Sequence, residues 1–316
     1  MTGTGTATVA LALSVLAPQE PLRFESRVDS VYVDAFVTQK GRPVLGLTAE
    51  NFEVRDNGVR QEIRLVSLDI VPLAVFLVFD TSSSVAGPAL GHLRAAGHAV
   101  LDGLRPGDRA ALVTYNHEVV VRVPPTDDLA GVRRVLDLIR AQGSSALYDA
   151  AYAGLVLPDR GARSVIVLFS DGEDNASWLK AEDVRSVAAR SDVLLQAVGV
   201  TDTIPVFVPG RGGPTDALQT GGRLRNQPSV ERIPSPRAAE LQRIAEATGG
   251  RFWKAEKTER LEDTFLRILE EMRSRYLLAF EPTGVEHAGE HQLEVRLKGA
   301  KGKVRSRRSY YFTPPP

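Results

Sequence analysis

Short apolar runs alternate with segments of helical periodicity along the middle of the chain. Apolar runs typical of buried strands occur at 73–79, 109–115, 118–123, 164–169 and 193–199. Helical spacing of apolar residues occurs at about 88–103, 128–141, 146–157 and 179–190. The alternation predicts an α/β fold, a doubly wound, mostly parallel sheet with helices on both faces. The run at 118–123 follows its predecessor too closely for an intervening helix, so we expect it at an antiparallel edge.

The pattern changes after this sheet. Residues 204–236 are rich in Pro, Gly and Arg without periodicity, which predicts a long exposed loop, with plain flexibility favoured over a role in interaction. A helix is predicted from Pro236 toward Gly249, followed by a short strand at 251–254 and a last helix from about 258 to 274. The α/β domain is therefore expected to span residues 71–274.

Strand-like segments flank this domain on both sides. Residues 31–37 alternate between apolar and polar, Asp56-Asn57-Gly58 is typical of a hairpin turn, and 275–282 and 291–297 are also strand-like. Neither flank contains enough strands to bury an apolar face alone. We therefore expect residues 29–70 and 275–312 to pair into one small β-sandwich-like module.

Polar residues follow two of the predicted buried strands. Asp80, Ser82 and Ser84 come directly after the run at 73–79, and Asp171 follows the run at 164–169. Ser145 lies in a loop of small residues before a predicted helix. In a doubly wound sheet these segments meet at one edge, so the five side chains can converge. Helix capping by Ser83 or Ser84 is the alternative interpretation of the first cluster.

The chemistry of these side chains favours a hard cation. Carboxylate and hydroxyl oxygens, without thiol or imidazole, suit Mg²⁺ or Mn²⁺ better than Zn²⁺. The five histidines have no spacing typical of a metal site. Glu173 and Asp174, beside Asp171, fit either a tuning role or an acidic solvent-facing turn.

These three segments together resemble the metal-ion-dependent adhesion site of the von Willebrand factor type A (VWA) domain. That site combines D-x-S-x-S, a loop threonine and an Asp-Gly, and the resemblance covers about residues 71–200. It implies a Rossmann-like fold in which Ser82, Ser84 and the loop hydroxyl bind the metal directly, while Asp80 and Asp171 bind it directly or through water. Ser145 stands where the family usually has threonine. It keeps the oxygen but lacks the methyl group that restricts the rotamer.

The flanks extend the resemblance to a bacterial group of VWFA-related proteins. The N-terminal flank is similar to that group over 31–58 and the C-terminal flank over 276–311, with Ser309 where the group tends to have glycine. Most members of the group have no assigned function, so this similarity informs architecture more than biology.

Composition and the N-terminus limit the classes of function. The 39 basic and 39 acidic side chains balance, so no global field favours nucleic acid, and we expect Arg305, Arg307 and Arg308 to lie on a solvated strand face. The chain has no cysteine, which excludes disulfides and thiolate metal sites. Residues 1–22 are interpreted as a signal peptide, with a disordered leader as the alternative, and no later stretch is apolar enough for a membrane anchor. This favours a secreted, periplasmic or cell-surface protein.

The function expected from the sequence is metal-dependent recognition of another protein. Three hydroxyls and two carboxylates leave a divalent cation under-neutralised, and an Asp or Glu of a protein partner would complete its coordination. No residue pattern supplies a catalytic base, so we expect no enzymatic activity. The alternatives are a metal-dependent phosphoester hydrolase and a structural domain in which the metal only stabilises loops.

Overall fold

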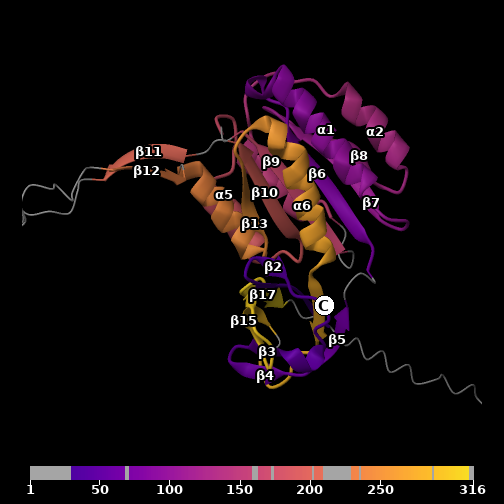
Figure 1. The fold of residues 1–316 in the computed structure, drawn as a ribbon, viewed down its shortest axis with the longest axis vertical. Coiled ribbons are helices and arrows are strands. Elements are labelled where there is room, and N and C mark those ends of the chain that lie inside the picture. Colours follow the sequence, from indigo (N-terminus) through magenta and orange to yellow (C-terminus); the bar gives the residue numbers. More distant parts are fainter. Residues whose placement is uncertain are drawn as a thin grey trace, which may run out of the picture.

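The computed structural model describes residues 30–67, 71–158, 163–171, 174–200, 203–208, 229–234, 236–286 and 288–312. These residues form an α/β domain, a small module of two β-sheets at one end of it, and a two-stranded ribbon that projects from it (Figure 1). The leader proposed at 1–22 lies outside the described residues. Within the described ranges, no helix combines the length and the apolar character needed to cross a membrane.

The central sheet has the predicted strands and topology. Its order is β13-β10-β9-β6-β7-β8, and every neighbouring pair is parallel except β7 with β8. The strands are β6 (Leu73–Asp80), β7 (Arg109–Tyr115), β8 (Val119–Thr126), β9 (Arg163–Ser170), β10 (Leu194–Val200) and β13 (Arg251–Ala255). The expected antiparallel edge strand, β8, is confirmed. It continues through Pro124 and Pro125, which an edge strand tolerates because one side of its backbone needs no hydrogen-bond partner.

Helices cover both faces of this sheet, as the alternation of residues along β6 requires. One apolar core joins Leu73, Val75, Leu77 and Phe79 of β6 to the helices α1, α2 and α6. The alternate residues of β6 face α3, α4 and α5. The helices are α1 (Pro88–Asp102), α2 (Leu129–Leu138), α3 (Leu147–Val156), α4 (Ala181–Ala188), α5 (Pro236–Ala247) and α6 (Leu261–Arg273). Short 3₁₀ turns occur at Ala49–Asn51, Ser83–Val85 and Thr258–Arg260.

The prediction that 204–236 has no regular structure is wrong at both ends of the segment. Strands β11 (Thr203–Val208) and β12 (Ser229–Pro234) pair as an antiparallel ribbon, with Phe207 opposite Val230. The Val, Ile and Phe residues at the two ends favour strands, but the Gly- and Pro-rich middle dominates the composition of the whole segment. A two-stranded ribbon also leaves each strand one free edge, where Pro205 is tolerated. Residues 209–228 lie outside the described part.

The two flanks form one module, as predicted. The first sheet has the order β16-β1-β14-β5, with β2 paired to β1, and the second has the order β17-β15-β3-β4. The N-terminal strands are β1 (Val31–Gln39), β2 (Arg42–Pro43), β3 (Phe52–Asp56), β4 (Val59–Gln61) and β5 (Ile63–Ser67). The C-terminal strands are β14 (Tyr276–Phe280), β15 (Gly289–Leu297), β16 (Lys303–Arg305) and β17 (Ser309–Phe312).

Both sheets of the module combine strands from the two flanks. In the first, β14 lies between β1 and β5, with Val33 opposite Leu278. In the second, Val54 lies opposite Val295. Apolar side chains from both flanks share one core. The hairpin turn is confirmed, because Asn57 (φ 46°) and Gly58 (φ 82°) join β3 to β4 with the positive φ angles that such a turn requires.

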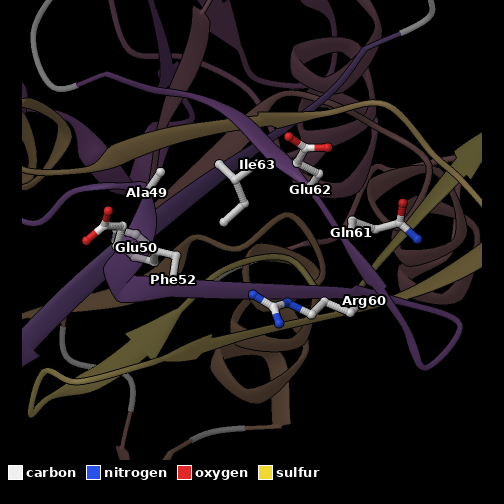
Figure 2. A pocket seen from close by; sticks show the side chains of 7 residues that line it. All are labelled: Ala49, Glu50, Phe52, Arg60, Gln61, Glu62 and Ile63. Carbon is white, nitrogen blue, oxygen red and sulfur yellow. The ribbon is translucent and has the colours of Figure 1, made fainter.

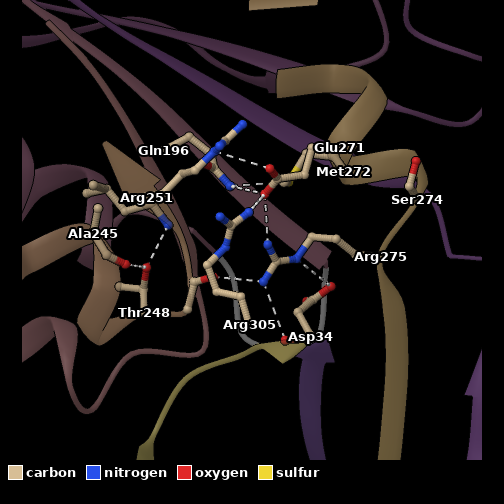
Figure 3. A network of polar contacts seen from close by, with 12 residues as sticks. Asp34, Gln196, Ala245, Thr248, Arg251, Glu271, Met272, Ser274, Arg275 and Arg305 are labelled. Carbon is tan, nitrogen blue, oxygen red and sulfur yellow. Dashed lines mark hydrogen bonds and ion pairs between the residues drawn. The ribbon is translucent and has the colours of Figure 1, made fainter. Parts of the chain in front are cut away.

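The module meets the α/β domain through ion pairs of buried or partly buried arginine side chains rather than through a solvated basic face. Arg305 donates to Glu271 of α6, and Arg307, only 6% exposed, donates to Asp192 and to the Tyr32 carbonyl. The expectation that Arg305 and Arg307 are solvated is therefore wrong. Glu271 also accepts from Arg275, which is fully buried (Figure 3). Sequence reasoning missed the pairs of Arg305 and Arg307 because their partners lie 34 and 115 residues away in the chain.

The module and the predicted metal site lie at opposite ends of the central strands. Arg163, the first residue of β9, donates to Asp34 of the module, while Asp171 directly follows the last residue of β9. The eight residues of β9 span about 26 Å at the usual rise per residue. The carboxyl-terminal edge of the sheet is therefore left to the site.

Candidate metal centre

Two adjacent strands bring the two carboxylates together. Asp80 is the last residue of β6, and Asp171 directly follows β9, which pairs in parallel with β6 and places Phe79 opposite Phe169. Both strands are entirely buried because helices cover both faces, so neither can shift without disturbing the core. The sheet thus fixes the two carboxylates at one edge, as predicted.

Asp80 is the hub of the cluster. Its Oδ1 accepts the backbone N–H of Ser82 at 2.8 Å, and its Oδ2 accepts the Ser145 hydroxyl at 3.1 Å. The Ser82 and Ser84 hydroxyl oxygens lie 3.0 Å apart. All three predicted hydroxyls therefore lie within one or two hydrogen bonds of Asp80.

The loop that carries Ser145 is fastened to the loop that carries the two other serines. The Ser83 N–H donates to the Gly143 carbonyl at 2.9 Å, and the Gln142 N–H donates to the Thr81 carbonyl at 2.8 Å. Gly143 has a φ of 77°, which favours glycine at this turn. These backbone bonds hold the hydroxyls in place without using their oxygens.

Asp80 is fully buried, with an exposed fraction of 0%. The two loops lie over it, with Ser82 3% and Ser145 1% exposed. Position at a strand end says where a residue lies along the sheet, but it does not say which loops cover it.

Burial changes the ionisation of this edge. Burial, helped by the charge of Asp171, raises the pKa of Asp80 to about 6, although hydrogen bonds from Ser82 and Ser145 oppose the shift. The pKa of Tyr115 is also raised, first by burial and then by the charge of Asp80, and its hydroxyl donates to the Phe169 carbonyl at 2.8 Å. A cation at this edge would offset the cost of the two neighbouring carboxylates.

The helix-capping interpretation of the first motif is not supported. The 3₁₀ turn Ser83–Val85 begins after Ser82, whose side chain makes no capping hydrogen bond. Helix α1 begins after Gly87, again without a side-chain cap. The serines of this motif are therefore not used to satisfy a helix terminus.

Sequence reasoning missed the residues that hold Ser145 in place. The Ser145 N–H donates to Asn175 Oδ1 at 2.8 Å, and the Ser145 carbonyl accepts from the N–H groups of Asn175 and Ala176. Asp174 accepts from the Leu147 N–H and caps the start of α3. The acidic turn is thus partly structural, and Glu173 lies outside the described residues. The Asp, Asn and Ser content of 174–177 signals capping, but it does not identify the helix that is capped.

The donor set fits a hard divalent cation. The oxygen donors are the hydroxyls of Ser82, Ser84 and Ser145 and the carboxylates of Asp80 and Asp171. Asp171 Oδ1 is buried and has no hydrogen-bond partner within the described structure, which is costly unless a ligand satisfies it. Among the described residues, no group of three or more His, Cys, Asp or Glu side chains is arranged to hold a metal. The cluster therefore depends on hydroxyl oxygens, which Mg²⁺ and Mn²⁺ accept.

A hollow of about 460 Å³ lies away from this edge, in the β-module (Figure 2). It is lined by Ala49, Glu50, Phe52, Arg60, Gln61, Glu62 and Ile63. Its acidic and basic side chains lie apart around the rim and do not converge on one point. We therefore assign no ligand to it.

Comparison with known proteins identifies the domain. The family model for the von Willebrand factor type A domain matches residues 75–173, which include all five predicted site residues. The inter-alpha-trypsin inhibitor heavy chain H2 of Mus musculus is 27% identical over 167 residues, covering 48% of this chain and 16% of that protein. An uncharacterized protein of Synechocystis sp. is 27% identical over 125 residues, covering 37% of this chain and 30% of that protein. The match thus spans less than a third of either relative.

Solved structures show more distant similarity. A von Willebrand factor type A protein from Catenulispora acidiphila has a TM-score of 0.49 at 13% identity, covering 88% of this chain and 76% of that one. Proximal thread matrix protein 1 from the mussel byssus has a TM-score of 0.49 at 17% identity, covering 69% and 51%. We draw no argument about the site from these similarities. The family match thus assigns residues 75–173 to a von Willebrand factor type A domain, and the α/β topology agrees with this assignment.

Proposed function

We propose that this protein binds another protein through a divalent cation held by Asp80, Ser82, Ser84, Ser145 and Asp171. The observation that carries the proposal is the hydrogen-bonded cluster of the buried Asp80, Ser82 and Ser145 at one sheet edge. At the same edge, Asp171 Oδ1 is buried and has no hydrogen-bond partner among the described residues. Mg²⁺ or Mn²⁺ fits these oxygens best. When bound, the cation supplies an electrophilic position for a carboxylate oxygen.

An Asp or Glu of the protein partner is the ligand that this donor set favours. Mg²⁺ requires octahedral coordination by oxygen, and the five side chains named above leave a position for an outside ligand. Three of the five donors are neutral hydroxyls. A charged carboxylate oxygen from outside would therefore bind the cation more strongly than a neutral oxygen.

Hydrolysis is the second candidate function, and the surroundings of the site do not favour it. A phosphoester hydrolase needs a base that can activate water. His117 packs against Gly143, beside the site, but within the described structure its ring contacts the Glu118 carboxylate at 3.9 Å rather than a site residue. The Tyr115 hydroxyl is engaged with the Phe169 carbonyl. We therefore propose a binding protein rather than an enzyme, and an exported one, in keeping with the apolar leader.

Affinity capture with and without chelator tests the proposed function. The full chain and its Asp80→Ala variant are immobilised and exposed to extract and culture medium from the source organism, in Mg²⁺ or in EDTA. We expect proteins retained by the parent chain in Mg²⁺ to be lost in EDTA and on the variant. Equal retention in all arms would contradict metal-dependent binding and would favour a metal that only stabilises loops. Turnover of bis(p-nitrophenyl) phosphate by the parent chain but not by the variant would favour the hydrolase.

A further inference from the structure

A tryptophan stands exposed beside the proposed metal site. The exposed fraction of Trp178 is 94%, the highest among the large hydrophobic residues that the structure describes as exposed. A single exposed apolar residue is common on protein surfaces and means little by itself. Trp178 differs from such a residue in two ways: it lies close to the segment of Ser145, and hydrogen bonds hold its loop in place.

The loop that carries Trp178 is tied to the segment that carries Ser145. The carboxylate of Asp149, in the first turn of α3, accepts the N–H groups of Trp178 at 3.0 Å and Leu179 at 2.9 Å. The Ser177 hydroxyl accepts the Tyr148 N–H at 3.0 Å. Together with the bonds from Asn175 and Ala176 to the Ser145 carbonyl, these contacts fasten the loop along its length. The backbone of Trp178 is thus held in place while its indole ring remains in solvent.

Rigid presentation of an exposed aromatic side chain is typical of a binding surface. Tryptophan contributes strongly to protein interfaces because it buries a large area, and a preordered loop loses little entropy on binding. The indole makes no packing contribution that would explain its place here, since it is almost fully exposed. Burying an apolar ligand group against the exposed indole would remove apolar surface of both from water. An apolar ligand group therefore fits the indole.

Trp178 follows closely the residues that bind the segment of Ser145. Asn175 and Ala176, whose N–H groups donate to the Ser145 carbonyl, lie three and two residues before Trp178. In an extended peptide, side chains two positions apart point to the same side and are separated by about 6.6 Å. One short ligand segment can thus place an acidic side chain at the metal and an apolar side chain on the indole.

We propose that Trp178 is a specificity-determining contact for partners that present an Asp or Glu with a large apolar residue close to it in the same segment. This inference rests on the proposed function, because it assumes that the carboxylate binds the metal. It adds the class of sequence that the site selects.

Fluorescein-labelled peptides test the inference. One peptide has a central aspartate, a leucine two positions after it and glycine elsewhere. A second has the leucine two positions before the aspartate, a third has arginine in place of leucine, and a fourth has only the aspartate. Binding of the full chain is measured by fluorescence polarisation in Mg²⁺ and in EDTA. We expect a leucine peptide to bind about tenfold more tightly than the aspartate-only peptide, as burial of one leucine predicts.

Trp178→Ala should remove this preference, and Trp178→Phe should keep most of it. Both variants should bind Mn²⁺ as the parent chain does in calorimetric titration, because the indole is not part of the metal site. Leu138→Ala, which truncates an exposed residue at the end of α2 (74% exposed), serves as the matched control and should keep the preference.

The outcomes separate the inference from the function on which it rests. Mg²⁺-dependent binding with the same leucine preference in Trp178→Ala would overturn the role of Trp178 alone. A stronger preference for arginine than for leucine would overturn the apolar assignment. Peptide binding that does not depend on Mg²⁺ would overturn the proposed function, and the absence of binding by any peptide would overturn both.

Discussion

Arg305, from the C-terminal flank, donates a hydrogen bond to Oε1 of Glu271, in the last helix of the α/β domain. The same oxygen accepts from Arg275 at 3.0 Å, and Arg251 lies 3.3 Å from Oε2 (Figure 3). Burial lowers the pKa of Arg275 to about 10, although Asp34 and Glu271 favour its charged form. One buried carboxylate therefore joins the β-module to the domain and neutralises part of a cluster of guanidinium groups.

Glu271→Ala should destabilise the protein strongly. It removes the carboxylate from several guanidinium groups, including the fully buried Arg275, and breaking a buried pair in this way costs about 3–5 kcal/mol. Urea unfolding of the full chain measures the loss. The control is Asp263→Ala, which breaks the exposed Arg260 pair on the same helix and should cost about 1 kcal/mol or less. Equal losses of unfolding free energy for the two variants would mean that the buried network stabilises the protein no more than an exposed ion pair does.

Asp80→Ala should weaken Mn²⁺ binding by about 100-fold or more. Mutation of a residue that only hydrogen-bonds to a metal ligand already lowers metal affinity by about 10- to 100-fold. Asp80→Asn should weaken it similarly while preserving the acceptor for the Ser82 N–H. In EDTA, Asp80→Asn should be at least as stable as the parent chain, since it removes a buried charge. Calorimetric titration and thermal melting measure the two effects. Parent-like Mn²⁺ affinity in both variants would remove Asp80 from the site.

Ser145→Ala should weaken Mn²⁺ binding by about tenfold, whereas Ser145→Thr should preserve or modestly tighten it. Threonine keeps the oxygen that donates to Asp80, and its β-branch restricts the rotamers. Because Ser145 is only 1% exposed, the added methyl group must fit a buried position, so melting temperatures are compared alongside the titrations. Identical titrations for the Ala and Thr variants would show that the Ser145 hydroxyl is not a ligand.

Features that depend on local pattern were predictable from the sequence. The apolar runs gave the strands of the central sheet, and parallel pairing then placed Asp80 and Asp171 at one edge, because all parallel strands end on the same side. Asn57-Gly58 indicated its hairpin because few residues accept two successive positive φ angles. The pairing of the two flanks followed from their shortage of strands. These are properties of periodicity, turn chemistry and topology.

Features that depend on distant partners were not predictable. Nothing near Arg305 in the sequence indicates Glu271 as its partner, and nothing near Asp80 indicates that the loop of Ser145 covers it. Trp178 resembles an ordinary apolar residue until its exposure is known. The ribbon of β11 and β12 was missed because its strands are separated by a segment of opposite composition.

The stability of the protein should fall at acid pH partly through Asp108. Burial raises the pKa of this carboxyl, but hydrogen bonds from Arg273 and from the N–H groups of Arg105 and Leu73 outweigh that effect and lower it below 3.8. A lowered pKa in the folded state stabilises the protein above pH 3.8, and this contribution is lost as the pH falls through the folded-state pKa.

Urea unfolding at pH 7 and pH 3 tests the role of Asp108. The stability difference between the parent chain and Asp108→Asn should be larger at pH 7 and should shrink at pH 3. Asp102→Asn, at an ion pair in which the aspartate side chain is 70% exposed, is the control and should show little difference at either pH. A constant difference for Asp108→Asn would contradict the assignment.

Deletion of residues 1–70 should cause aggregation through the C-terminal strands. Strand β14 lies between β1 and β5, both of which the deletion removes, so Tyr276–Phe280 would lose its partners on both edges. Strand β15 would lose β3 at the same time, and the shared apolar core would open. Exposed strand edges with apolar faces drive association between chains.

Light scattering of the truncated chain measures this association, and hydrogen exchange reports on each sheet separately. We expect the central sheet, covered by its own helices, to retain slow exchange while β14 and β15 lose it. A monomeric truncated chain with slow exchange in β14 would show that the C-terminal flank folds without the N-terminal one.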